Sequence, residues 1–406
     1  MTSIRNNINS VIPFIPFRIL KKLFSTDGHA LRRIEPLRGA ILFIDIAGFT
    51  SLTIALSKIK PKGIEIQQEI LSNYFAKLIT IIREFGGVVY QFAGDSILVS
   101  FEIIKDENDP KCAFRACSCA LKIQNSFFHF KKIEAIPGKI FSLITKIGIG
   151  YGDYYEIHLG NEETRLNPII VGKACDLGIK AEKFSPPGET IVSDEIWNFL
   201  PQDKKGEQIE NFYKLKIIPE GKDMPKFDYN IPESNLGKKF LKQCSGYIYQ
   251  DLFKKYTTGI KGFQGDYREV ACLFISFGGL DFHFDAKESA KKLNQFYEHA
   301  QNQSRKYGGI LSQVDLTDKG NVFLFLFGAH TALEKKEIRA TQLAFQLIKV
   351  KDLFPFIDTF RAGITTGLLY CGDVGAAFRK DYTALGRFIN LAARLKIGRA
   401  SCRERV

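Results

Sequence analysis

The sequence predicts an α+β fold built from two related domains. Two observations support this prediction: apolar strand-like runs alternate with amphipathic helical patterns, and segments of the first half recur in the same order in the second half. The repeat has a period of a little over 200 residues, which is typical of two domains and not of a solenoid. A chain of 406 residues is long enough to give each domain its own core.

Composition and repeat positions divide the chain into five parts. Residues 1–38 are predicted to form a segment that packs on the first domain, 39–200 the first domain, and 201–265 a polar, lysine-rich connection. Residues 266–395 are predicted to be the second domain, shorter than the first. Residues 396–406 match nothing in the first half, and we expect an extraneous tail after a truncated domain.

The first domain begins with the pattern strand, turn, helix and hairpin. The aliphatic run Ala40–Ile44 predicts a buried strand, and the apolar face of Glu65–Ile82 predicts an amphipathic helix that ends at Gly86-Gly87. Two further strand-like runs, 88–92 and 97–101, predict a hairpin. Later elements are expected at residues 110–130 (helix), 144–149 (strand), 173–184 (helix) and 190–193 (strand).

Two aspartates follow strand-like runs of this first domain. Asp45 comes directly after Ala40–Ile44, and Asp95 stands in the turn of the hairpin. A desolvated carboxylate without a partner costs several kcal/mol, and two brought together repel unless cations lie between them. Mg²⁺ prefers carboxylate and phosphate oxygens, so the pair predicts a magnesium site for a nucleotide. The alternative is that each aspartate merely ends a strand or fills a turn.

A glycine-containing turn connects Asp45 to the next expected helix. The residues Ile46-Ala-Gly-Phe-Thr50 place backbone N–H groups at a helix start, where they can bind phosphate. We therefore expect Ala47, Gly48, Phe49 and Thr50 to contact the phosphates of the nucleotide.

The second copy lacks the two aspartates. Ser276 stands in the position of Asp45, and Asn321 in that of Asp95, so the second copy cannot hold the same metals. This loss confines the predicted metal site to the first domain.

The second copy instead carries polar residues that the first copy lacks. Asn390 and Arg394 are four residues apart and share one helical face, which suits a sugar and a phosphate that gains charge. The first copy has Asp176 and Lys180 in their place. Each half thus supplies what the other lacks, which predicts one composite site between the domains and a second, degenerate pocket.

Charge and cysteine content limit the partners only loosely. The net charge of +13 permits an anionic partner, but the lysines are scattered and no basic run is interleaved with aromatic residues. The cysteines lack zinc-spaced pairs and indicate reduced thiols of a cytoplasmic protein. No apolar run is long enough to span a membrane. The basic amphipathic stretch 11–24 either packs on the protein or contacts a membrane surface.

Three segments give the chain a resemblance to a known family. Residues 43–50 (FIDIAGFT), 92–96 (FAGDS) and 382–394 (YTALGRFINLAAR) resemble the class III nucleotidyl cyclases, most closely the soluble, bicarbonate-responsive type with tandem catalytic domains. The resemblance covers roughly residues 35–395 and keeps order and spacing. It implies a ferredoxin-like βαββαβ core in each half, paired head to tail as an intramolecular pseudo-dimer, so that the chain works as a monomer.

The resemblance also implies a reaction and roles for single residues. Two Mg²⁺ ions, for which Mn²⁺ could substitute, would be held by Asp45, Asp95 and the Ile46 carbonyl, and ATP would become 3′,5′-cyclic AMP and pyrophosphate. Asn390 would orient the ribose, and Arg394 would stabilise charge on the phosphorus. Lys146 would bind the terminal phosphates; the alternative is a solvated strand lysine.

Base selection and regulation are implied by fewer residues. Gln313, Thr383 and Ala384 stand at the base-binding positions, and they favour ATP over GTP. The degenerate pocket would use Gln91 and Lys180, where the bicarbonate-responsive relatives have a lysine and an arginine, so we expect a blunted or absent response to bicarbonate.

Two other functions compete with this interpretation. One is a regulatory module that binds nucleotide without turnover. The other is a basic protein that binds nucleic acid or membrane, which leaves the aspartates unexplained, so we expect no nucleic-acid partner.

Overall fold

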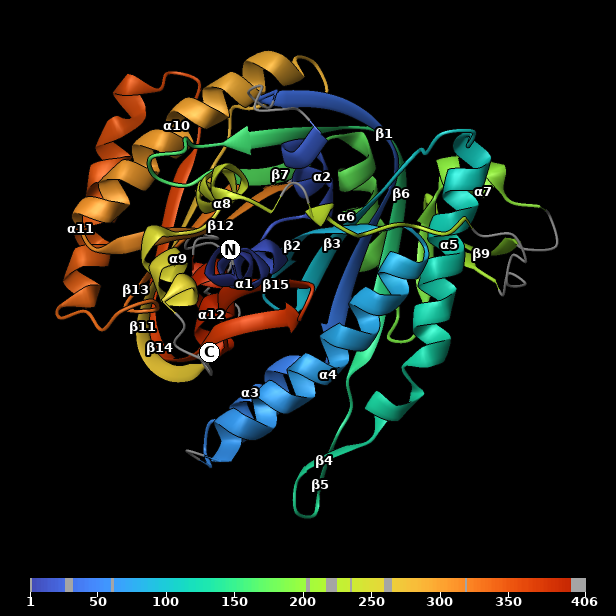
Figure 1. Ribbon diagram of the computed structural model, residues 1–406, viewed down its shortest axis with the longest axis horizontal. Helices are drawn as coiled ribbons and strands as arrows, with labels where there is room; N and C mark the ends of the chain where they lie inside the picture. Colours follow the sequence, from blue (N-terminus) through green and yellow to red (C-terminus); the bar gives the residue numbers. More distant parts are fainter. Residues whose placement is uncertain are drawn as a thin grey trace.

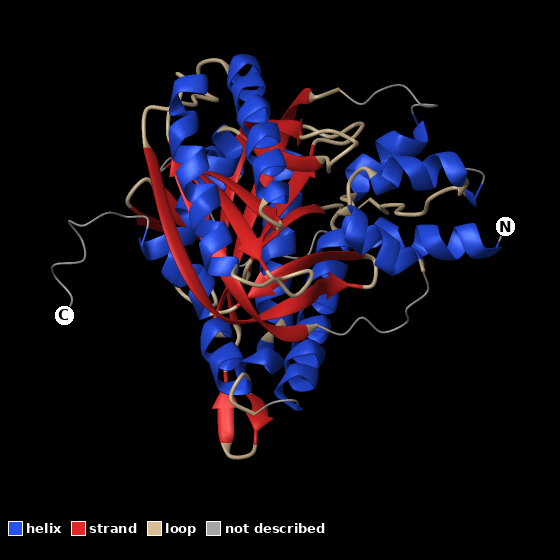
Figure 2. Ribbon diagram, turned by 90° about the vertical axis from the view of Figure 1, so that its left-hand side faces the viewer, coloured by secondary structure: helices blue, strands red, loops and turns tan. Residues whose placement is uncertain are grey.

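The structure is a computed structural model that describes residues 2–25, 32–59, 62–201, 205–216, 225–233, 236–258, 265–317 and 320–395. Two β-sheets lie near its centre and helices cover them (Figures 1 and 2). The last predicted part, residues 396–406, lies outside the described residues.

The first domain contains the larger sheet, in the order β2-β3-β1-β6-β8-β10-β9, with β7 paired to β6. The first four strands of this order, with the helices between them, give the predicted βαββαβ arrangement. The bounds of its elements are β1 (Ile34–Ala47), α3 (Phe49–Leu56), α4 (Lys62–Glu84), β2 (Val88–Ala93), β3 (Ser96–Glu102), α5 (Asp109–Ser126), β4 (Ile133–Ile136), β5 (Lys139–Phe141), β6 (Ile144–Leu159), β7 (Asn167–Val171), α6 (Lys173–Lys183), β8 (Thr190–Ser193), α7 (Asp194–Phe199), β9 (Lys205–Ile209) and β10 (Phe212–Leu215).

The second domain repeats this arrangement in a sheet of order β12-β13-β11-β14-β15. Its strands β11, β12, β13 and β14 take the places of β1, β2, β3 and β6, which confirms the predicted α+β fold and the repeat. Its elements are β11 (Asp266–Phe277), α10 (Ala286–Lys306), β12 (Gly309–Thr317), β13 (Gly320–Phe327), α11 (Lys336–Lys349), β14 (Phe360–Ala376), β15 (Arg379–Leu385) and α12 (Arg387–Leu395).

The two domains pack reciprocally. Helix α4 of the first domain contacts β14 of the second, and α10 of the second contacts β6 of the first. Each domain core continues into its neighbour: Tyr370 and Val374 are buried with the first core, and Ile157 and Leu159 with the second. Apolar burial of this kind is the main favourable contribution to holding the halves together.

The connection differs from the polar linker that composition predicts for residues 201–265. Its first part, β9 and β10, extends the first sheet because β10 pairs with β8. Its later part contains two short helices, α8 (Lys238–Ser245) and α9 (Gln250–Thr257). The first domain therefore extends past residue 200, and its strand β1 begins at Ile34, before residue 39.

The amino-terminal segment bridges both domains instead of packing on the first alone. It comprises α1 (Thr2–Val11), η1 (Ile12–Phe14) and α2 (Phe17–Ser25). Its apolar side chains are buried with the connection and with the outer face of the second sheet, which leaves none of its buried core residues to contact a membrane. These core residues are Ile8, Val11, Phe14, Ile15, Ile19, Leu20 and Leu23.

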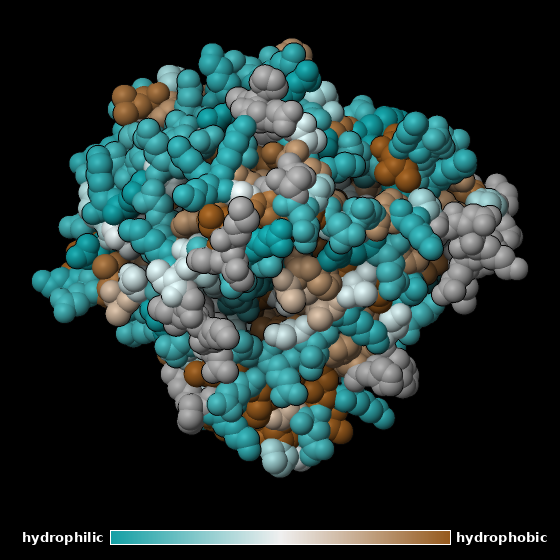
Figure 3. All heavy atoms as spheres, in the orientation of Figure 1, coloured by the Kyte–Doolittle hydropathy of each residue, from teal (hydrophilic) through white to brown (hydrophobic). Residues whose placement is uncertain are grey.

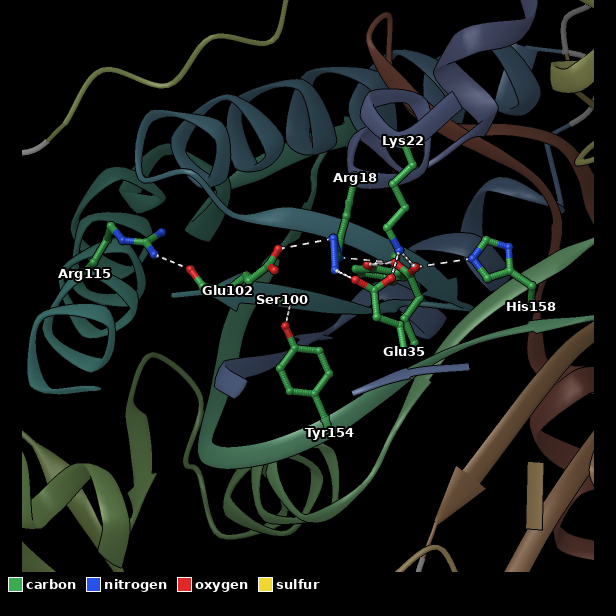
Figure 4. Close-up of polar contacts among 10 residues, drawn as sticks. Arg18, Lys22, Glu35, Ser100, Glu102, Arg115, Tyr154 and His158 are labelled. Atoms are coloured by element: carbon green, nitrogen blue, oxygen red, sulfur yellow. Dashed lines mark hydrogen bonds and ion pairs between the residues drawn. The ribbon is translucent and has the colours of Figure 1, made fainter. Parts of the chain in front are cut away.

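Two cations on α2 pair with a cluster of first-domain carboxylates (Figure 4). Arg18 lies 2.9 Å from Glu35, 3.4 Å from Glu102 and 3.5 Å from Glu156, and Lys22 contacts both Glu35 and Glu156. The Glu156 side chain is fully buried. Burial raises its pKa, but the hydrogen bond from His158 and the charges of Arg18 and Lys22 outweigh burial and bring the pKa to about 2.

Among the described residues, no helix combines the length and hydropathy that crossing a membrane requires. The described cysteines are buried free thiols. On the face shown in Figure 3, hydrophilic side chains predominate and hydrophobic ones form separate patches.

We predict that Arg18→Leu lowers the free energy of unfolding by about 3–5 kcal/mol, because it leaves the buried Glu156 carboxylate with less compensating charge. Urea denaturation of both proteins measures the change. Arg5→Leu is the matched control, since Arg5 pairs with an exposed glutamate, and its effect should stay below about 1 kcal/mol. Equal effects of the two substitutions would contradict the role given to Arg18.

Candidate functional site at the domain interface

Asp45 lies near the end of β1, and its surroundings are polar. The hydroxyl of Ser96 donates to Asp45 Oδ1 at 2.7 Å. In the antiparallel ladder Asp45 stands opposite Lys146 of β6, so the two side chains lie on one face of the sheet. The apolar run thus places the carboxylate near the carboxyl end of an interior strand.

Asp95 lies in the turn between β2 and β3, close enough to Asp45 for their charges to interact. Burial and then the negative charge of Asp45 raise the pKa of Asp95 from 3.8 to about 6. Glu182 of α6 adds a smaller repulsion. Asp95 is thus a buried carboxylate beside a second carboxylate.

Lys146 forms an ion pair with a carboxylate of the protein itself. Its Nζ donates to Glu182 Oε1 at 2.6 Å, and the Glu182 side chain is only 10% exposed. Burial raises the pKa of Glu182, and Lys146 partly offsets this rise. Glu182 was missed by sequence reasoning, because a glutamate two residues after Lys180 on a helix carries no motif that distinguishes it from a solvated residue.

The carboxylates suit magnesium that arrives with phosphate. No group of three or more histidine, cysteine, aspartate or glutamate residues in the described part of the chain could hold a metal ion by itself. Mg²⁺ commonly uses one or two carboxylates and completes its shell with water and substrate phosphates. Asp45, Asp95 and the carbonyl of Ile46 are such a partial set, and the mutual repulsion of the two aspartates fits a cation between them.

Gly48 turns the chain from β1 into α3. Its φ of +92° is left-handed, and a Cβ there would lie 2.0 Å from the Ser142 carbonyl oxygen, so no other residue fits without displacing backbone. The first N–H groups of α3, from Phe49 and Thr50, have no acceptor within the helix. Thr50 and Phe49 also line the interface pocket described next.

A pocket between the domains brings residues of both halves together. It is narrow, with a volume of about 20 Å³. Thr50 and Asp95 line it from the first domain, and Ala384 and Asn390 line it from the second. Asp95 and Asn390 thus face one cleft, although they are far apart in the sequence.

The other predicted contacts of the metals and the nucleotide do not line this pocket: Asp45, Ile46, Ala47, Gly48, Lys146, Gln313, Thr383 and Arg394. Arg394 is exposed in the last turn of α12, and Thr383 is buried in β15. The amide of Gln313 donates to both carboxylate oxygens of Asp315, at 2.9 and 2.8 Å. Asp315 is a polar neighbour of the predicted base-binding residue that the sequence pattern did not single out.

Residues near the predicted degenerate pocket make contacts between the domains. Gln91 donates to the Val314 carbonyl at 3.1 Å and to Asp315 at 2.9 Å. His283 lies 2.9 Å from Asp176. Lys180 is partly buried on α6.

Comparison with known proteins gives the following. No protein-family model matches the chain. Adenylate cyclase type 10 of Homo sapiens is 24% identical over 392 residues, which are 88% of this chain and 23% of that protein. The Mus musculus protein is 23% identical over 406 residues, 90% of this chain and 24% of its own length. The chain therefore spans about a quarter of the length of these curated relatives.

A solved structure shares the fold over nearly the whole chain. It is a class III adenylyl cyclase-like ATP-binding protein from Pseudomonas aeruginosa, with a TM-score of 0.60 and 13% identity. The match covers 93% of this chain and 88% of that one. The similarity in sequence and the shared fold agree with the resemblance that the three motifs indicate.

We predict that Asp95→Asn stabilises the metal-free protein. Below pH 3.8 both states hold this proton, and as the pH rises to about 6 the unfolded chain loses it while the folded protein keeps it, so folding free energy is lost. The substitution should restore about 1–3 kcal/mol at pH 7 in EDTA, measured by calorimetry.

Asp352→Asn, at an exposed position, is the control and should change little. A less stable Asp95→Asn protein in EDTA would show that the carboxylate is not repelled as described.

Proposed function

We propose that this chain, which has the fold of the class III nucleotidyl cyclases and resembles adenylate cyclase type 10, converts ATP to 3′,5′-cyclic AMP and pyrophosphate. The observation that carries the proposal is the shared cleft. Asp95, a predicted metal ligand, and Asn390 of the other domain line the same pocket. Neither domain holds both kinds of residue, so the reaction needs the interface.

Binding of the substrate uses backbone and side chains of both domains. Asp45, Asp95 and the Ile46 carbonyl would hold two Mg²⁺ ions, which acidify the ribose 3′-hydroxyl and neutralise phosphate charge when bound. The N–H groups at the start of α3 donate to phosphate oxygens. The Asn390 amide orients the ribose, and Ala384 and Thr383 lie on the strand that leads to it.

The reaction is one displacement at the α-phosphorus. The ribose 3′-oxygen forms a bond to this phosphorus, the bond to the bridging oxygen breaks, and pyrophosphate leaves. Arg394 at the end of α12 stabilises the charge that grows on the phosphorus, an effect of a few kcal/mol in comparable sites. Lys146 first releases its internal partner Glu182 and then binds the terminal phosphates.

ATP is the substrate that we propose over GTP. The Gln313 amide nitrogen is held by Asp315, which leaves the amide oxygen as an acceptor for an exocyclic amino group. The adenine 6-amino group is such a donor, whereas guanine has an acceptor oxygen at that position.

A binding module without turnover is the second candidate. The structural neighbour named as an ATP-binding protein favours it. So do the internal partners of Lys146 and Gln313, because both groups must rearrange before they contact a nucleotide.

We predict that the protein releases pyrophosphate and forms cyclic AMP from ATP in the presence of Mn²⁺. Asp45→Asn should lower the rate by at least about a hundredfold, because it removes a carboxylate that neutralises the metals. Product chromatography with ATP and with GTP measures both activity and base preference.

Asp352→Asn is again the control and should keep the native rate. Tight nucleotide binding without any pyrophosphate release would contradict turnover and support a binding module.

A further inference from the structure

A second cavity lies away from the candidate active site, where four parts of the chain meet. Its volume is about 390 Å³, and it is walled by the amino-terminal segment, by α4 and β2, by residues 229–231 and Leu236 of the connection, and by the β14–β15 hairpin. Most of its wall is apolar, including Ile12, Leu20, Ile79, Val88 and Ile231. A pocket of this size and polarity is typical of a small-molecule site.

The Arg83 side chain in this wall has N–H donors that are available to a ligand. The Arg83 guanidinium stacks between two rings, 4.2 Å from the centroid of Tyr229 and 4.4 Å from that of Phe378. Among the residues that the structure describes, none accepts a hydrogen bond from Arg83. The two rings contact the guanidinium through its carbon, and its N–H groups can bind a carboxylate bidentately, as arginine commonly does.

One of the two rings beside Arg83, that of Tyr229, is itself held in place. The Tyr229 hydroxyl donates to the Gly87 carbonyl at 3.1 Å. Phe227 covers Gly86 so closely that a Cβ there would lie 2.1 Å from its ring. These contacts attach this part of the connection to the turn between α4 and β2.

The remaining polar groups favour an anion. Arg379, the other guanidinium in the wall, donates to the carbonyls of Val89 and Tyr90 at 2.9 and 2.7 Å and stays positively charged beside the cavity. No aspartate or glutamate is among the described residues that line it. Burial lowers the pKa of Arg83, as expected for a cation without an acidic partner.

We propose that this cavity binds a small amphipathic anion, a medium-chain carboxylate whose chain lies along the apolar wall and whose carboxylate pairs with Arg83. Because both domains and the amino-terminal segment contribute walls, the bound molecule bridges them and stabilises their arrangement. The proposal stands on this cavity alone and does not rest on cyclase activity.

Titration calorimetry with decanoate below its micellar concentration tests the proposal, with 1-decanol as the uncharged match. We expect saturable 1:1 binding of decanoate, at least about tenfold tighter than that of decanol. Arg83→Met, which keeps the aliphatic stem, should remove this difference, since a hydrogen bond to a charged group corresponds to about tenfold or more in affinity. Arg5→Met removes a nearby guanidinium that does not line the cavity, and it should bind decanoate as the native protein does.

A filling variant tests the location even if Arg83→Met is poorly folded. Ile231→Trp occupies the cavity from the connection, and it should abolish binding of both compounds. The proposal is overturned if native protein does not bind decanoate, if decanol binds equally well, or if Ile231→Trp leaves decanoate binding unchanged.

Discussion

The guanidinium of Arg379 holds the two halves of the candidate site in one arrangement. It stands at the start of β15 and donates to the carbonyls of Val89 and Tyr90 in β2 of the other domain. The ladder between β2 and β3 shifts register between Val89 and Gln91, and such a bulge frees backbone groups for other partners. From this contact β2 leads to Asp95, and β15 leads through Ala384 to Asn390. A buried guanidinium that loses its acceptors is costly, so the contact resists relative movement of the two strands.

Charge balance explains why this arrangement suits a metal–nucleotide complex. Asp45, Asp95 and Glu182 influence one another electrostatically, while Lys146 is the cation that pairs with one of them. The second domain has Ser276 and Asn321 in the corresponding places, and the Asn321 amide donates to a backbone carbonyl. The repelling carboxylates thus belong to the first domain, where Asp95 lines the pocket shared with Asn390. Gln91 of the same domain donates to Asp315 of the second.

The sequence predicted those features that depend on short stretches of chain. The strand before Asp45, the hairpin around Asp95 and the repeat of both in the second half follow from apolar runs and turn residues. The β9–β10 hairpin was missed because its sequence is polar and its stability comes from pairing with β8. The partners of Lys146 and Gln313, and the bridging position of the amino-terminal segment, depend on contacts between distant residues. Such contacts leave no periodic pattern, so single-sequence reasoning could name these residues but not their surroundings.

The central claim is that carboxylates of one domain and the asparagine of the other act in a single site. A double-mutant cycle of Asp95→Asn and Asn390→Ala, read as pyrophosphate release from ATP with Mn²⁺, tests it most directly. Residues that act as a unit give strongly non-additive effects, so the double variant should be scarcely slower than the slower single variant. If the rate reductions of the two single variants multiply in the double variant, or if Asn390→Ala keeps the native rate, a shared site is contradicted.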